Sequence, residues 1–277
     1  MELSEKDLLI AAQAGDRRAI ERLLTTYVPR LGRFAGRMCH NTADAEEVVQ
    51  ETLIAAARTL PNFRAESSVS TWLYTIARSF CIKQRRRGRT VRRADTSLDD
   101  PNSAASAELA DDHPRPDANL ADRELGEAID HAVASLAPMY REVLILRDME
   151  GLSAPEVAES LGLGLEAVKS RLHRARLAVR EQLAPALASP DASHDSTSTC
   201  PDVLGLYSRH LEGDIRAETC AAMETHLAQC PRCRGRCDSL RRTLVLCKTS
   251  PGPAVPPSTQ QLVRVALQRA MSISSQE

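Results

Sequence analysis

Two helices joined by a glycine-containing turn, within residues 136–180, constrain the fold of this chain more than any other stretch. A first apolar helix ends shortly before Ser153, which can cap the next helix, and Glu156 three residues later completes a capping box. That helix should run to about Leu161, where Gly162 and Gly164 permit a tight turn. The pattern predicts a helix-turn-helix.

The helix after this turn has two distinct faces. Val168, Leu172, Ala175 and Val179 form one apolar stripe for packing. The neighbouring face carries cations, a hydroxyl and an imidazole, which suit base edges and phosphates in a DNA major groove. A solvated helix face is the alternative, but the agreement of cap, turn and stripe favours DNA. The candidate DNA-contacting residues here are Lys169, Ser170, Arg171, His173 and Arg174.

Composition favours helices throughout the chain. Only 3% of the 277 residues are aromatic, and β-branched residues are scarce, so strands are disfavoured and we predict an all-α, multi-domain fold. The N-terminus does not resemble a signal peptide, and the sequence has no apolar run of membrane-spanning length. We therefore expect a cytoplasmic protein with no membrane contact.

Charge is strongly segregated, although the net charge is only −1. Seven cations and no acid lie between Lys83 and Arg93. They begin in the last turns of a helix that we expect to be capped by Ser70 and Thr71 and to run from Trp72 to about Arg87. A few cations would suit the end of a helix, but seven favour phosphate binding. An acidic linker with eight acids and several prolines follows, at residues 95–122.

Four separate motifs resemble extracytoplasmic-function (ECF) sigma factors. Residues 44–52 (DAEEVVQET), 63–68 (FRAESS) and 70–78 (STWLYTIAR) resemble their region 2, and residues 168–176 (VKSRLHRAR) resemble their region 4. The motifs occur in the family's order and separation, with no room for a region 3 domain. Two positions depart from the family pattern: Ser79 replaces the usual Asn, and Lys83 replaces a frequent Asp. The preferred minus-ten sequence therefore cannot be carried over.

The resemblance implies a transcription factor, not an enzyme, that brings core RNA polymerase, through its β′ and β subunits, to promoter DNA. The acidic helix would dock on the β′ clamp helices through Asp44, Glu46, Glu47, Gln50 and Glu51. The following loop and helix would melt the minus-ten element and hold a flipped base, which requires a pocket and cations. The residues implied are Phe63, Arg64, Ser67, Trp72, Arg78, Ser79, Lys83, Arg85 and Arg86.

Cysteines cluster in the last third of the chain, six of them between Cys200 and Cys247. His226 and Cys230 are four residues apart on one predicted helix, and Cys233 follows after two residues. With an upstream cysteine these supply four ligands for a tetrahedral zinc-type site, which we favour over thiols at chance spacing. Thiolates also suit copper or cadmium. The candidate metal ligands are Cys200, His226, Cys230, Cys233, Cys220, Cys237 and Cys247.

This tail resembles the zinc-binding anti-sigma domain, and its six cysteines resemble the CorE-like, metal-dependent ECF sigma factors. The resemblance implies a regulator acting in cis in place of a separate anti-sigma factor. Three alternatives stay open: a redox-sensing tail, a purely structural zinc tail, and a metal-responsive helix-turn-helix repressor or activator.

The predicted organisation has six parts. Residues 1–93 form region 2, 94–121 an acidic linker, 122–184 region 4, 185–199 a second linker, 200–247 the cysteine-rich domain, and 248–277 a proline-rich spacer with a short helix.

Overall fold

The computed structural model describes residues 4–39, 41–95, 120–185, 187, 200–252, 261 and 264–265, without the side chains of 88–95 and 120–123. Every regular element among these residues is helical, and they include no strand, which confirms the all-α prediction. No helix among them is both long and apolar enough to cross a membrane. The chain forms two compact units, residues 1–115 with 252–277 and residues 116–251.

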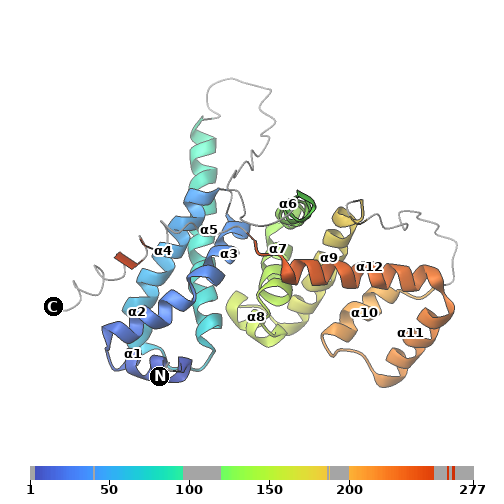
Figure 1. The fold of residues 1–277 in the computed structure, drawn as a ribbon, viewed down its shortest axis with the longest axis horizontal. Helices are drawn as coiled ribbons and strands as arrows, with labels where there is room; N and C mark the ends of the chain where they lie inside the picture. Colours follow the sequence, from blue (N-terminus) through green and yellow to red (C-terminus); the bar gives the residue numbers. More distant parts are fainter. Residues whose placement is uncertain are drawn as a thin grey trace. The chain divides into compact units, whose positions relative to one another are not determined.

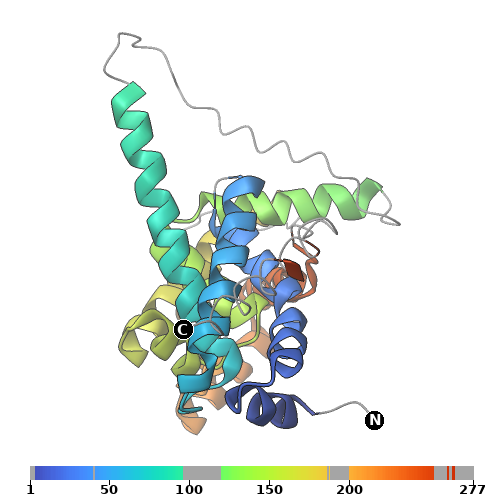
Figure 2. The same ribbon diagram turned by 90° about the vertical axis from the view of Figure 1, so that its left-hand side faces the viewer.

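The first unit is a bundle of helices (Figures 1 and 2) with buried apolar side chains. The helix α4 lies alongside the long helix α5 in both views. The fully buried side chains of this unit include Phe34, Leu53 and Tyr74. The ring centroids of Phe34 and Tyr74 are 5.3 Å apart. The elements are α1 (Glu5–Gln13), α2 (Arg17–Thr26), α3 (Val28–Met38), α4 (Thr42–Thr59), a 3-10 turn (Leu60–Asn62) and α5 (Val69–Asp95).

Side-chain caps set the helix starts in this unit. Asp16 caps α2 and Asn41 caps α4 through hydrogen bonds from backbone N–H groups. The predicted start of α5 was wrong: the helix begins at Val69, because Ser68 Oγ accepts a hydrogen bond from the Thr71 backbone N–H at 3.1 Å. It also continues to Asp95, beyond the predicted end near Arg87. The linker residues 96–119 lie outside the described residues.

The second unit holds eight helical elements among its described residues (Figure 1). The long helix α12 packs on α9, and α10 contacts both of these helices. The elements are α6 (Leu120–Ser135), α7 (Pro138–Leu144), a π-helical turn η2 (Ile145–Met149), α8 (Ala154–Leu161), α9 (Leu165–Leu183), α10 (Val203–Leu211), α11 (Ala217–Gln229) and α12 (Pro231–Thr249).

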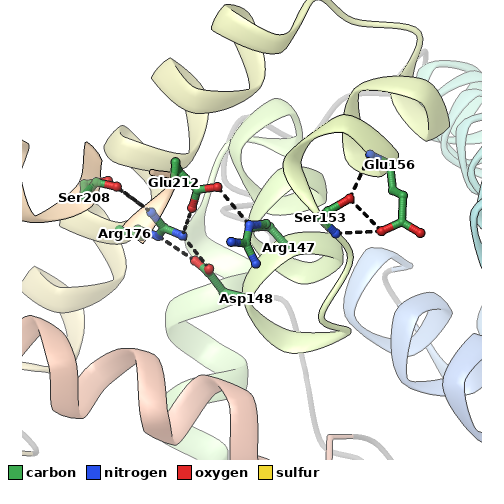
Figure 3. Close-up of polar contacts among 7 residues, drawn as sticks. All are labelled: Arg147, Asp148, Ser153, Glu156, Arg176, Ser208 and Glu212. Carbon is green, nitrogen blue, oxygen red and sulfur yellow. Dashed lines mark hydrogen bonds and ion pairs between the residues drawn. The ribbon is translucent and has the colours of Figure 1, made fainter. Parts of the chain in front are cut away.

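The predicted helix-turn-helix is present as α8 and α9. The Ser153 backbone N–H donates to Glu156 Oε2 at 2.9 Å, and the Glu156 N–H donates to Ser153 Oγ at 3.4 Å, so the capping box is confirmed (Figure 3). Gly162 ends α8 with φ of +63°, a left-handed conformation that suits glycine. The predicted stripe of α9, Val168, Leu172, Ala175 and Val179, is buried.

Replacing Ser153 by Ala should destabilise the second unit by about 1 kcal/mol, because the first turn of α8 loses its side-chain acceptor. Amide hydrogen exchange in α8 measures this change. Ser153→Thr keeps the hydroxyl and is the matched control, for which we expect less than about 0.5 kcal/mol. Equal exchange rates in both variants would show that the cap contributes nothing.

The cysteine-rich tail has its own apolar core, which one side chain of α9 completes. Val203, Leu204, Tyr207, Met223 and Leu240 are buried together with Cys233 and Cys237. Leu177 of α9 packs against this cluster. The tail and the helix-turn-helix therefore share packing within one unit, although the linker at 188–199 is outside the described residues.

The predicted C-terminal helix falls largely outside the described residues. Within the first unit, Arg264 Nε lies 3.1 Å from Glu21 Oε1 of α2, with 60% of the Arg264 side chain exposed. An exposed ion pair of this kind contributes little to stability.

Candidate metal centre and nucleic-acid interface

Four of the seven predicted metal ligands converge in the tail. One ligand atom from each of Cys200, His226, Cys230 and Cys233 lies within 4.8 Å of all the others. His226 comes from the last turn of α11, Cys230 from the junction, and Cys233 from the first turn of α12. Three thiols and one imidazole at this spacing form the donor set of a structural zinc site.

Two local features fit a metal at this cluster. His226 Nε2 is buried with no hydrogen-bond partner, which is costly unless the nitrogen has a ligand. The backbone N–H of Cys233 lowers the pKa of the Cys230 thiol, whereas burial raises the pKa of Cys233 to about 12. A metal that binds Cys233 would displace its proton, since the thiolate is the ligand.

The structure does not bring the other three predicted ligands into this cluster. Cys220 Sγ lies 3.5 Å from His210 Nδ1 and 3.7 Å from Glu224 Oε1. Cys237 is buried in the tail core, where its thiol faces the Val203 carbonyl at 3.8 Å. Cys247 is also buried. A role for these three cysteines in metal binding stays a prediction.

The cationic face of α9 is largely engaged within the protein. Lys169 Nζ lies 3.1 Å from Glu166 Oε1 and 3.1 Å from Asp214 Oδ1, and these carboxylates, Asp214 first, raise the Lys169 pKa. Arg171 Nη1 lies 4.0 Å from Glu142 Oε1. Arg174 is exposed and donates to the Tyr140 hydroxyl at 3.2 Å.

The two remaining predicted contacts of α9 differ in their surroundings. Ser170 is exposed, whereas His173 is half-buried, and its Nδ1 has no hydrogen-bond partner. Of the five predicted DNA contacts on this helix, Lys169 is thus the one paired with an acid of the tail.

A buried ion cluster joins α9 to the tail, and no local pattern in the sequence indicates it (Figure 3). Arg176 is 1% exposed and binds Asp148 with two hydrogen bonds of 2.8 and 2.7 Å. Its Nη2 also donates to Glu212 Oε1 at 2.6 Å, and its Nη1 donates to Ser208. Burial lowers the Arg176 pKa, but the hydrogen bonds and charges of Asp148 and Glu212 raise it by a larger amount. The net effect is a raised pKa, so the guanidinium is charged.

In the first unit, the predicted polymerase-binding residues, four acids and Gln50, lie along α4. Glu47, Gln50 and Glu51 are exposed, whereas Asp44 and Glu46 are half-buried near the start of the helix. A shallow groove between α4 and α5 is lined by Glu47 and Glu51 on one side and by Lys83 and Arg87 on the other. Arg87 Nη1 lies 3.3 Å from Glu47 Oε1, so these acids face cations of α5.

The aromatic residues predicted to hold a flipped base contact one another. The rings of Phe63 and Trp72 stack with centroids 4.7 Å apart, and both side chains are half-buried. Gln13 of α1 donates a hydrogen bond to the Phe63 carbonyl at 2.6 Å, which ties the loop to the bundle. Ala65 within this loop has φ of +54°, a conformation that is uncommon for a residue with a side chain.

The remaining predicted contacts of this unit lie on the loop and on α5. Arg64 is exposed, and its Nη1 lies 3.9 Å from Glu66 Oε1. Ser67 is half-buried. Ser79, Lys83 and Arg86 are exposed, whereas Arg78 and Arg85 are half-buried.

Two helical units, a helix-turn-helix and a Cys/His cluster that could hold a metal ion are together features of a DNA-binding protein. Comparisons with known proteins give the family. Residues 23–91 match Sigma-70 region 2, residues 126–179 match Sigma-70, region 4, and residues 200–234 match a family described as a putative zinc-finger.

Three relatives match this chain across nearly their whole length. The RNA polymerase sigma-H factor of Pseudomonas aeruginosa is 30% identical over 184 residues, which are 66% of this chain and 95% of that protein. The RNA polymerase sigma factor YlaC of Bacillus subtilis is 30% identical over 60% of this chain and 93% of its own. RpoE of Bartonella quintana, solved in complex with the anti-sigma factor NepR, superposes with a TM-score of 0.48 and 29% identity over 58% of this chain and 94% of its own.

The ECF RNA polymerase sigma factor SigW of Bacillus subtilis is 28% identical over 66% of this chain and 98% of its own. The chain therefore belongs to the ECF sigma factors, and it has, in addition to regions 2 and 4, a C-terminal segment that matches a family described as a putative zinc-finger. This membership excludes the alternative of a metal-responsive helix-turn-helix repressor or activator.

Proposed function

We propose that this protein directs core RNA polymerase to promoters and that its own cysteine-rich tail controls this activity through a bound metal. Region 2 would dock on the polymerase β′ and β subunits through the acids of α4 and open the minus-ten element. Region 4 would bind the minus-thirty-five duplex through α9. The protein would thus act by binding rather than by catalysis.

One observation supports control in cis above all others. Cys233 is both a member of the four-ligand cluster and part of the apolar core against which Leu177 of α9 packs. A metal at this cluster would hold the tail in the form that packs on α9. It can shift the equilibrium between packed and released tail only through a difference in affinity for the two forms. Because Cys233 belongs both to the ligand cluster and to the core that Leu177 contacts, we expect metal to favour the packed form.

Zinc is the metal that the donor set suits best, because three cysteines and one histidine in a tetrahedral arrangement are typical of structural zinc sites. Copper and cadmium compete well for thiolates and could displace zinc or bind the remaining cysteines. We therefore include in the proposal that these metals change the activity of this protein, as in the CorE-like, metal-dependent sigma factors.

Transcription by core polymerase with this protein, under reductant and with titrated zinc, copper or cadmium, tests the proposal. A truncation after Ala188 is the matched control, because it keeps both matched sigma regions and removes the cysteine-rich tail. We expect metal to change transcription by the full chain severalfold and to leave the truncation unchanged.

Equal transcription by both proteins at every metal level would reject metal control and would leave a structural zinc tail. A change on peroxide treatment with no change on metal titration would instead favour the redox alternative, in which oxidation of Cys230 and Cys233 with a nearby thiol releases the tail.

A further inference from the structure

The turn between α10 and α11, Glu212–Asp214, places two carboxylates against the proposed DNA-binding helix. We call this segment the acidic turn. Glu212 binds Arg176, and Asp214 binds Lys169, which is seven residues earlier on α9. Seven residues are two helical turns, about 10.5 Å along the axis, so Lys169 and Arg176 lie on one face. Gly213, with φ of +65°, ends α10 between the two acids.

The Glu212 contact is buried and completes a charge balance. Its Oε1 accepts from Arg176 at 2.6 Å and its Oε2 accepts from Arg147 at 2.9 Å, with only 3% of its side chain exposed. Region 4 supplies Arg147, Arg176 and Asp148 to this cluster, which is one positive charge in excess. Glu212 of the tail neutralises it. Buried charges need such pairing, so the cluster fits the tail-bound arrangement.

The Asp214 contact is of a different kind. The Asp214 side chain is 43% exposed and that of Lys169 is 19% exposed, so this ion pair lies at the rim of the interface. A rim ion pair adds little stability, but it neutralises a cation that would otherwise be available to a phosphate.

We propose that the acidic turn is an intramolecular competitor of duplex DNA: Glu212 anchors it to region 4 through Arg176 and Arg147, while Asp214 occupies Lys169. The inference rests on the proposed contact of α9 with DNA. A packed tail would then weaken promoter binding through Glu212 and Asp214.

Binding of a fluorescently labelled random-sequence duplex, measured by anisotropy at low and moderate salt, tests this competition in the full chain at constant zinc and under reductant. Asp214→Asn removes the charge without disturbing a buried group. We expect it to bind the duplex about threefold to tenfold more tightly than the native chain. The logarithmic salt slope should steepen by about 0.9, because one more phosphate contact forms.

Glu218→Gln is the matched control, since it removes one exposed negative charge from the tail at the start of α11. We expect it to change the affinity less than twofold. In a Lys169→Ala background, Asp214→Asn should give no gain, because the side chain that it frees is gone.

The Glu212→Gln variant provides a second, independent test. It should loosen the tail, so amide exchange in α10 should rise more than tenfold while the duplex affinity also rises.

If Asp214→Asn and Glu218→Gln change the duplex affinity equally, or if Asp214→Asn still raises it in the Lys169→Ala background, the proposed competition is wrong. The α9 helix would remain a candidate DNA-binding helix. Failure of all variants and of the truncation after Ala188 to bind duplex would instead reject the proposed DNA contact itself, and the competition with it.

Discussion

Replacing Arg176 by Met should destabilise the second unit by about 3 kcal/mol or more, because two buried carboxylates lose their shared cation. The side chains of Asp148 and Glu212 are 9% and 3% exposed, so water cannot replace the guanidinium. Lysine at this position should not restore stability, since it cannot reproduce the two-pronged contact with Asp148.

Amide hydrogen exchange within α9 is the measurement, with an expected loss of protection of roughly 100-fold for a 3 kcal/mol effect. Trp72 is the only tryptophan and lies in the first unit, so its fluorescence reports whether that unit stays folded. Arg174→Met, on the exposed side of the same helix, should cost less than about 0.5 kcal/mol. Equal protection in the two variants would show that the buried cluster is not stabilising.

Replacing Cys233 by Ser should abolish zinc binding and unfold the tail. Cys233 is 1% exposed and belongs to both the ligand cluster and the apolar core, so its loss removes a ligand and leaves a buried hydroxyl. Structural zinc sites supply much of the folding free energy of small domains, so the loss should be cooperative.

Zinc content after gel filtration, together with limited proteolysis, measures this effect. We expect about one zinc per native chain and less than about a tenth of that in the variant. Cys220→Ser is the matched control, because Cys220 lies outside the cluster, and it should keep its zinc. Zinc loss in both variants alike would point to a different ligand set.

Local patterns in the sequence predict most of the elements and the four-ligand cluster. The capping box of Ser153 and Glu156 and the glycine at 162 act within a few residues, so spacing alone shows them. The same holds for His226, Cys230 and Cys233, which lie within eight residues on adjoining helix ends. The upstream cysteine joins the prediction because a tetrahedral site needs a fourth ligand.

The ion cluster could not be predicted because its partners lie far apart in the chain. Arg176 is 28 residues from Asp148 and 36 from Glu212, and each of these is an ordinary charged residue in its local context. The π-helical turn at Ile145–Met149, which carries Arg147 and Asp148, also has no sequence signal that we recognised. Long-range pairing of this kind depends on tertiary packing, and periodicity does not report it.

The predicted DNA contacts of α9 likewise have long-range partners that local sequence patterns do not reveal. Helical spacing predicts Lys169 and Arg174 as cations available to DNA, yet one faces Asp214 of the tail and the other the Tyr140 hydroxyl. Local spacing places these side chains on the second helix of the helix-turn-helix. It cannot show that an acid 45 residues later meets one of them.

The most direct test of control by the tail is the duplex affinity of the full chain with zinc bound and after zinc removal by a chelator under reductant, with the truncation after Ala188 measured alongside. The account predicts that chelation raises the affinity of the full chain to that of the truncation, which itself does not respond to chelation. An affinity of the full chain that is the same with and without zinc would contradict it.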